Sequence, residues 1–275
     1  MSRVSVYMKE MIMDREFPAR VCAGICAVFC LFFLPLAYRN YFFDINRYKV
    51  ELIIGCMPVL AMLMTAASAY RHKKMQVHVD RGLKHIFYVL GLFAVACVVS
   101  SALRGFEQAV LDGSEGRYCG MVFLVCCVLM FYIIAFGRIS GKYVLALASL
   151  AAVCVALLGV INAHGLDPLG FYVRMRPEQI HLFISTIGNV DFYGGYLVTI
   201  LPLAACGYVH CSNRRRYIAL ICAIVIMMGI PVSRTDSTYF AMHFALLFLL
   251  SLSGNSYLAM MWRLSFALLR GEFCL

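Results

Sequence analysis

The polar residues with the richest chemistry lie in one stretch, 185–197, which reads Ser-Thr-Ile-Gly-Asn-Val-Asp-Phe-Tyr-Gly-Gly-Tyr-Leu. Its helix-capping residue types are Ser185, Thr186, Asn189 and Asp191. Gly188 lets the chain turn sharply. The unpaired N–H groups of a helix start attract anions. Two interpretations therefore stand: a well-capped helix, or an anion site built from Gly188, Asn189 and Asp191.

Three arginines are candidates for holding an anion beside that stretch. Arg174 and Arg176 lie just upstream, and Arg234 lies in a tight turn further along the chain. The planar guanidinium suits phosphate oxygens. The alternatives are that Arg174 and Arg176 extend toward lipid headgroups, and that Arg234 pairs locally with Asp236.

Other chemistry is sparsely represented. His164 and His181 are loop histidines that could act as bases, but neither has a nucleophile at telling spacing. Most of the 13 cysteines lie within apolar runs and are interpreted as small apolar residues. We identify no metal site, no glycine-rich phosphate loop and no cofactor motif, and so expect no cofactor.

The elements that position these residues are apolar. Hydrophobic residues make up 63% of the 275-residue chain and charged residues 14%, whereas soluble domains carry about 25% charged residues. The formal net charge is +10, but the cations cluster between apolar runs, as in the cytoplasmic loops of membrane proteins. A soluble domain and a nucleic-acid partner are therefore disfavoured. The lipid bilayer is the expected partner.

A transmembrane helix needs about 20 mainly apolar residues. The sequence predicts an all-α, polytopic transmembrane helix bundle, a single domain over 1–275 with about eight spans. The expected spans are 18–38, 52–69, 86–103, 118–136, 143–163, 192–209, 217–232 and 238–252. A long outer loop covers 162–190, and an amphipathic tail, 256–275, is expected to lie at the membrane interface.

The orientation follows from the cations. With the N-terminus in the cytoplasm, 16 Lys and Arg fall on the inner side and 8 on the outer side. This bias favours a cytoplasmic N-terminus. The loop 162–190 and Arg234 then lie outside.

Three stretches together resemble the O-antigen ligase family of membrane glycan transferases. The first runs from Ser100 through Gly113, Gly116, Arg117 and Gly120. The second is Gly-Leu-Asp-Pro-Leu at 165–169, similar to the family's "fG-x-DP" element. The third and most specific is 185–197 with Leu-Pro-Leu at 201–203, similar to "TfGNpNffagYL…lPL". Ser233 and Arg234 resemble the family's "SR" element, and Asp191 stands where the family often has asparagine.

The resemblance implies transfer of a glycan from a polyprenyl-pyrophosphate carrier to an acceptor on the outer face of a bacterial inner membrane, without metal or nucleotide. It also implies that Arg234 holds the pyrophosphate. The family's catalytic histidine lies in a later outer loop that has no counterpart here, so the catalytic residue is unknown. We expect this chain to be a truncated N-terminal portion, inactive alone and completed by a C-terminal fragment.

Two other functions remain open. A polysaccharide polymerase of the same architecture would use the same carrier with a growing glycan as acceptor. A non-enzymatic transporter or membrane subunit would need no base at all.

Overall fold

The computed structural model describes residues 17–42, 44–71 and 81–253, and these are overwhelmingly helical. Within these described residues, six helices are long and apolar enough to cross a membrane: Phe17–Leu36, Ile45–Ala66, Leu83–Leu103, Gly141–Ala163, Val190–Val209 and Arg214–Ser233. The chain is therefore an all-α, multi-pass membrane protein, as predicted. The expected tail 256–275 and most of the expected cytoplasmic segment around 72–80 lie outside the described residues.

The other two expected spans correspond to shorter helices. The helix α7 (Met121–Phe136) is apolar but has 16 residues, which gives a length of about 24 Å against a hydrocarbon core of about 30 Å. The helix α11 (Asp236–Ser253) has 18 residues.

The chain divides into two compact units. The first comprises Met1–Phe29 and Asn46–Ser140, and the second comprises Cys30–Ile45 and Gly141–Leu275. Each unit is thus built from two separate stretches of chain.

In the first unit, α7 packs against α2 (Phe17–Val28) and α5 (Arg81–Leu103). Tyr132 of α7 donates a hydrogen bond to the Phe87 carbonyl of α5 at 2.5 Å. The Phe87 ring stacks on Phe136 with centroids 4.7 Å apart. This unit also contains α4 (Ile45–Arg71) and the short α6 (Gln108–Asp112).

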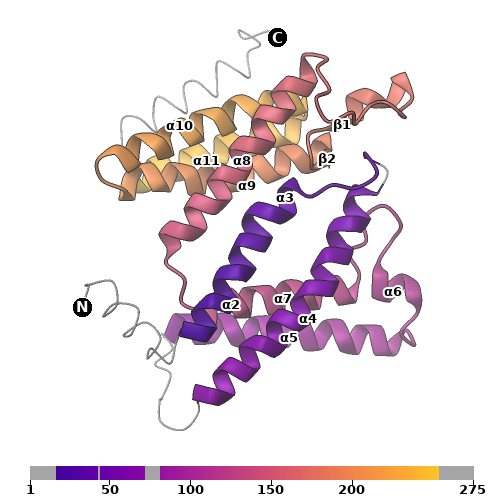
Figure 1. Cartoon of the computed structure of the whole chain (residues 1–275), viewed down its shortest axis with the longest axis vertical. Helices are drawn as coiled ribbons and strands as arrows, with labels where there is room; N and C mark the ends of the chain where they lie inside the picture. Colours follow the sequence, from indigo (N-terminus) through magenta and orange to yellow (C-terminus); the bar gives the residue numbers. More distant parts are fainter. Residues whose placement is uncertain (1–16, 43, 72–80, 254–275) are drawn as a thin grey trace, which may run out of the picture. The chain divides into compact units, whose positions relative to one another are not determined.

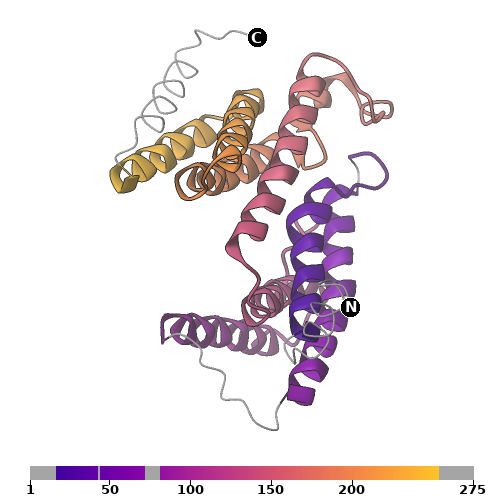
Figure 2. The ribbon, with the colours of Figure 1, turned by 60° about the vertical axis from the view of Figure 1, so that its left-hand side comes forward.

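The second unit gathers four long helices. They are α8 (Gly141–Ala163), α9 (Val190–His210), α10 (Arg214–Gly229) and α11, and α9 contacts the other three (Figures 1 and 2). The helix α3 (Leu34–Leu36), which follows a π-helical turn (Phe29–Phe33), packs beside α8. The connection from α8 to α9 holds the 3-10 helix η2 (Pro177–Leu182) and the strands β1 (Phe183–Ile184) and β2 (Gly188–Asn189). A second 3-10 helix, η3 (Ile230–Ser233), joins α10 to α11.

Small residues let these helices approach closely, as is usual where helices pack within a membrane. The Tyr193 side chain of α9 is fully buried, and its hydroxyl donates to the Gly229 carbonyl of α10 at 3.0 Å. A Cβ atom added at Gly159 of α8 would lie 2.6 Å from Cζ of Tyr193, and one at Gly229 would lie 3.0 Å from the Tyr193 hydroxyl. The two glycines therefore make room for one tyrosine, which fixes α9 between α8 and α10.

Candidate functional site

The chain at 183–189, which includes the start of the family-like stretch 185–197, folds into a small hairpin that leads into α9. Strands β1 and β2 pair antiparallel, with Ile184 opposite Gly188. The connecting turn needs left-handed backbone, with φ of +55° at Ser185 and +92° at Gly188. Glycine adopts this conformation without strain, which explains its place at Gly188.

The hydroxyl groups of this turn are buried and donate to backbone carbonyls. Ser185 Oγ donates to the Val155 carbonyl of α8 at 2.8 Å, and its N–H donates to Asn162 Oδ1 at 3.0 Å. Thr186 Oγ1 donates to the Pro35 carbonyl at 2.9 Å. Buried polar groups are costly unless hydrogen-bonded. These two residues thus attach the hairpin to the bundle.

Asn189 caps α9, as the sequence suggested. Its Oδ1 accepts a hydrogen bond from the Asp191 N–H at 2.9 Å, and the helix begins at Val190, two residues before the expected start. Asp191 is exposed in the first turn. Its carboxylate there compensates the helix dipole and would repel a second anion. The start of α9 therefore needs a nearby cation to hold a phosphate.

Arg234 is the best candidate for the cation beside the start of α9, because its backbone is fixed and its side chain is exposed. It adopts a left-handed conformation with φ of +53° directly after η3. The turn is held by Ser233 Oγ, which donates to the Ile230 carbonyl at 2.8 Å, and by the Tyr239 hydroxyl, which donates to the Pro231 carbonyl at 3.1 Å. Across the described residues, no ion pair joins Arg234 to Asp236.

The η3 turn packs against the first turns of α9. A Cβ atom added at Gly194 would lie 3.1 Å from Ser233 Oγ and 2.5 Å from Thr238 Oγ1 of α11. Ser233 immediately precedes Arg234, and Gly194 lies about 6 Å along the helix axis from Val190 at 1.5 Å per residue. Arg234 and the turn formed by 188–191 therefore lie at the same end of α9.

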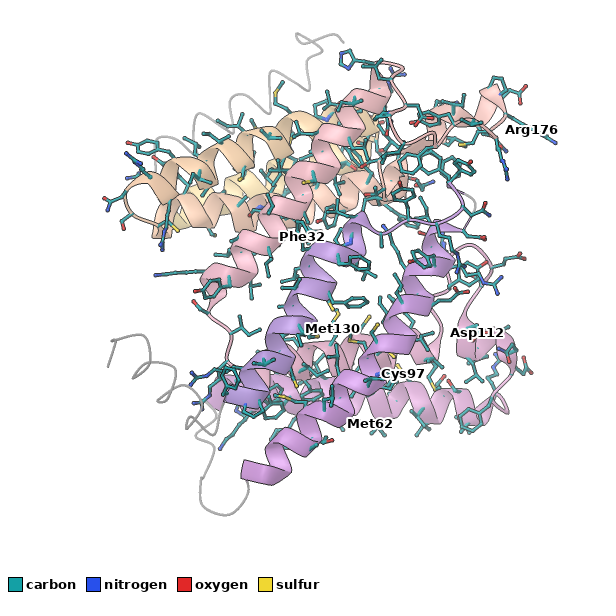
Figure 3. The ribbon with its side chains drawn as sticks, viewed as in Figure 1. Phe32, Met62, Cys97, Asp112, Met130 and Arg176 are labelled. Carbon is teal, nitrogen blue, oxygen red and sulfur yellow. The ribbon has the colours of Figure 1, made fainter. Side chains whose placement is uncertain are left out.

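The other two candidate arginines lie on the loop between α8 and η2. The Cζ atom of Arg174 is 5.4 Å from the centroid of the Tyr41 ring, a cation–π contact. Arg176 is exposed, and its side chain points outward at the far end of the loop (Figure 3). The structure thus groups Arg234 with 188–191, while Arg174 rests on Tyr41 and Arg176 points away from the helices.

The loop itself is organised by residues whose roles sequence reasoning missed. The two carboxylate oxygens of Asp167 accept hydrogen bonds from the N–H groups of Phe171 and Tyr172, both at 2.8 Å. The Tyr172 hydroxyl donates to the Phe183 carbonyl of β1 at 3.0 Å. Burial and the nearby Asp167 carboxylate raise the pKa of Tyr172 to about 12. The Asp-Pro pair was the available signal, since aspartate often bonds backbone N–H groups downstream in turns.

The glycines of the first family-like stretch also have a backbone role. Gly120 donates its N–H to the Asp112 carbonyl at 3.2 Å. A Cβ atom at Gly113 would lie 2.6 Å from the Gly120 nitrogen. The two glycines close this loop backbone to backbone, so larger residues would force it open.

The two candidate histidines, His164 and His181, both lie on the connection between α8 and α9. His164 Nδ1 lies 2.9 Å from the Val160 carbonyl, which fixes Nδ1 as the donor and leaves Nε2 as the basic nitrogen. His181 is exposed on η2. Among the described residues, no three His, Cys, Asp or Glu side chains are grouped so that they could hold a metal ion.

Comparison with known proteins identifies no relative: no family model, no curated protein and no solved structure matches the chain.

Proposed function

We propose that this chain binds a polyprenyl-pyrophosphate-linked glycan at the outer face of a bacterial inner membrane and takes part in its transfer to an acceptor, as O-antigen ligases do. The motif resemblance of 185–203 and of Ser233–Arg234 supports this proposal. A polymerase would bind the same carrier at the same place and differ only in its acceptor.

The observation that carries the proposal is the position of Arg234. Two stretches that resemble family motifs pack together through Gly194 and Ser233, which are 39 residues apart in sequence. An exposed guanidinium there can donate two parallel hydrogen bonds to phosphate oxygens. A helix start leaves N–H groups without partners inside the helix, so the start of α9 can add donors to the same region beside the capped Asp191 N–H.

In glycan transfer, the acceptor hydroxyl attacks the anomeric carbon and the pyrophosphate leaves with the bonding electron pair. Arg234 would stabilise the negative charge that grows on the leaving pyrophosphate. A base must also take the acceptor's proton, within about 2.6–3.2 Å or through one water. No histidine of this sequence matches the family's catalytic one, so we expect this chain to bind the carrier without multiple turnovers.

The test is binding of a polyprenyl pyrophosphate to the purified full chain in lipid nanodiscs. Hydrogen bonds to charged groups contribute about 1.5–3 kcal/mol, so Arg234→Ala should weaken binding about 10- to 150-fold. Arg234→Lys should retain part of the affinity, because lysine keeps the charge but loses the planar fork. Lys142→Ala removes an exposed cation at the start of α8, outside the family-like stretches, and serves as the control. Equal affinity in Arg234→Ala and Lys142→Ala would remove Arg234 from the site.

A second function, a non-enzymatic membrane subunit, is favoured by one observation. Ser185 and Thr186 use their hydroxyls on backbone carbonyls, and Asp191 places a negative charge at the helix start. Asp191→Asn separates the two functions. If the start of α9 binds pyrophosphate, removing the repulsive carboxylate should tighten carrier binding. No binding by either form would favour the subunit.

A further inference from the structure

Three consecutive arginines, Arg214, Arg215 and Arg216, begin α10 at the end opposite η3. The first turn of α10 holds no acidic residue, and the N-cap Asn213 makes no side-chain capping bond. Cations at a helix N-terminus are unfavourable because the helix dipole is positive there. This end of α10 therefore concentrates positive charge that the helix itself does not compensate.

Arg216 is held in place by α9. Its Nη2 donates to the Tyr208 hydroxyl at 2.8 Å, and its Cζ lies 4.3 Å from the centroid of the Tyr208 ring. Tyr208 is 2% exposed. The Nε of Arg216 is buried without a hydrogen-bond partner in the described part of the chain. One arginine of the three is thus fixed by an aromatic ring rather than by a carboxylate.

Arg214 and Arg215 are exposed, and within the described residues none of the three arginines forms an ion pair with an acid. The turn that precedes them, 211–213, contains no Asp or Glu. The three arginines therefore form a basic patch that the described part of the chain does not neutralise, so a counter-charge must come from elsewhere.

The neighbouring residues indicate where that counter-charge resides. Tyr217 follows the patch and is 63% exposed, and the exposed Ile218 and Ile221 continue along the same helix. Exposed aliphatic side chains on a transmembrane helix face lipid, and tyrosine is enriched at headgroup level. The basic patch thus lies at the level of the lipid headgroups, on the side that the charge bias assigns to the cytoplasm.

We propose that the basic patch of Arg214, Arg215 and Arg216 binds the phosphate of an anionic phospholipid. Arg214 and Arg215 contact the phosphate, while Arg216, held on Tyr208, adds fixed positive charge beside it. The bound anion also compensates the cations at the positive end of the α10 dipole. This site is separate from the glycan-carrier site and does not depend on it.

Native mass spectrometry of the detergent-purified full chain tests the proposal, with phosphatidylglycerol as the anionic probe and phosphatidylethanolamine as the zwitterionic one. Each arginine near an anionic lipid surface contributes about fivefold in binding, so the double variant R214Q/R215Q should bind phosphatidylglycerol about 25-fold more weakly. The single variant Arg215→Gln should lose about fivefold. Lys142→Gln is the matched control, because it removes one exposed cation at the start of α8.

The result expected is preferential binding of phosphatidylglycerol that is retained in Lys142→Gln and reduced in Arg215→Gln. Equal binding of the two lipids, or equal losses in the two single variants, would overturn the proposal. Inorganic phosphate is added in a separate arm. If phosphate alone displaces the lipid at comparable concentration, the patch binds free anions, and the lipid proposal is wrong. Melting curves show whether each variant remains folded. If the double variant is unfolded, the comparison between Arg215→Gln and Lys142→Gln decides.

Discussion

Two adjacent glycines on α9 offer a sharp test of the packing described above. A Cβ atom at Gly194 would lie 2.5 Å from Oγ1 and 2.9 Å from Cγ2 of Thr238, whereas one at Gly195 would meet nothing within 4 Å. Ordinary contacts begin at 3.4 Å, so Gly194→Ala must push α11 away by about 0.9 Å, an overpacking that typically costs about 1–3 kcal/mol. Gly195→Ala should not show this cost.

The comparison removes the intrinsic effect of alanine on the helix. Both substitutions add the same helix propensity, worth about 1 kcal/mol in water. The difference in unfolding free energy between Gly194→Ala and Gly195→Ala therefore measures the steric clash alone. Thr238 is 4% exposed and β-branched, so its side chain cannot easily rotate away.

The assay is reversible unfolding of the purified protein in mixed micelles, titrated with sodium dodecyl sulfate and followed by circular dichroism. Gly194→Ala should be less stable than Gly195→Ala by about 1–3 kcal/mol. In a Thr238→Ala background the clash is relieved, and the coupling energy should be about 1 kcal/mol or more. Equal stability of the two alanine variants, or no relief by Thr238→Ala, would refute the assigned contact between α9 and α11.

Three further predictions concern the membrane topology and the connection between α8 and α9. In a variant that retains Cys119 as its single cysteine, an impermeant thiol reagent should label Cys119 in intact cells. In a variant whose single cysteine replaces Arg215, labelling should require lysis. The reverse pattern would show that the predicted orientation is wrong. Asp167→Asn should speed hydrogen exchange at the Phe171 and Tyr172 amides about 10- to 150-fold, because charge-assisted bonds of about 1.5–3 kcal/mol are weakened; unchanged exchange would contradict this role. The pKa of Tyr172 is raised in the folded protein from 10.0 to about 12, so between these pH values only the unfolded chain has released the Tyr172 proton and folding stability should fall as pH rises. The Tm of the wild type should therefore fall relative to that of Tyr172→Phe between pH 10 and 12. A constant Tm difference would exclude the effect.

The apolar helices could be predicted from the sequence because their signal is local. Their ends could not, because polar residues also continue helices. The helix α4 begins at Ile45, seven residues before the expected start at 52, and its polar first turns contain an Arg47–Glu51 pair at 3.0 Å. Conversely, α7 begins at Met121, three residues after the expected start, because the chain up to Gly120 is used to close the preceding loop.

The candidate site was predictable in part for the same reason. Asn189 as the α9 cap follows from residue type and spacing. The positions of Ser185 and Thr186 do not, because their partners lie 30 and 151 residues earlier in the chain. The packing of glycines around Tyr193 could not be predicted either. A Gly-x-x-x-Gly pattern places two glycines on one helix, whereas Gly159 and Gly229 lie on different helices and contact the same tyrosine.

The hydrogen bond from Thr186 to the Pro35 carbonyl has a consequence for the order of assembly. The first transmembrane helix ends near Pro35, and its partner is made 151 residues later. At about 5–20 residues per second, that delay is roughly 8–30 s. During this interval the first helix resides in the membrane without this bond, and four further apolar helices, α4, α5, α7 and α8, are synthesised. The end of the first helix therefore reaches its final hydrogen bonding only when the hairpin before α9 emerges, so a segment made late in synthesis completes the earliest helix.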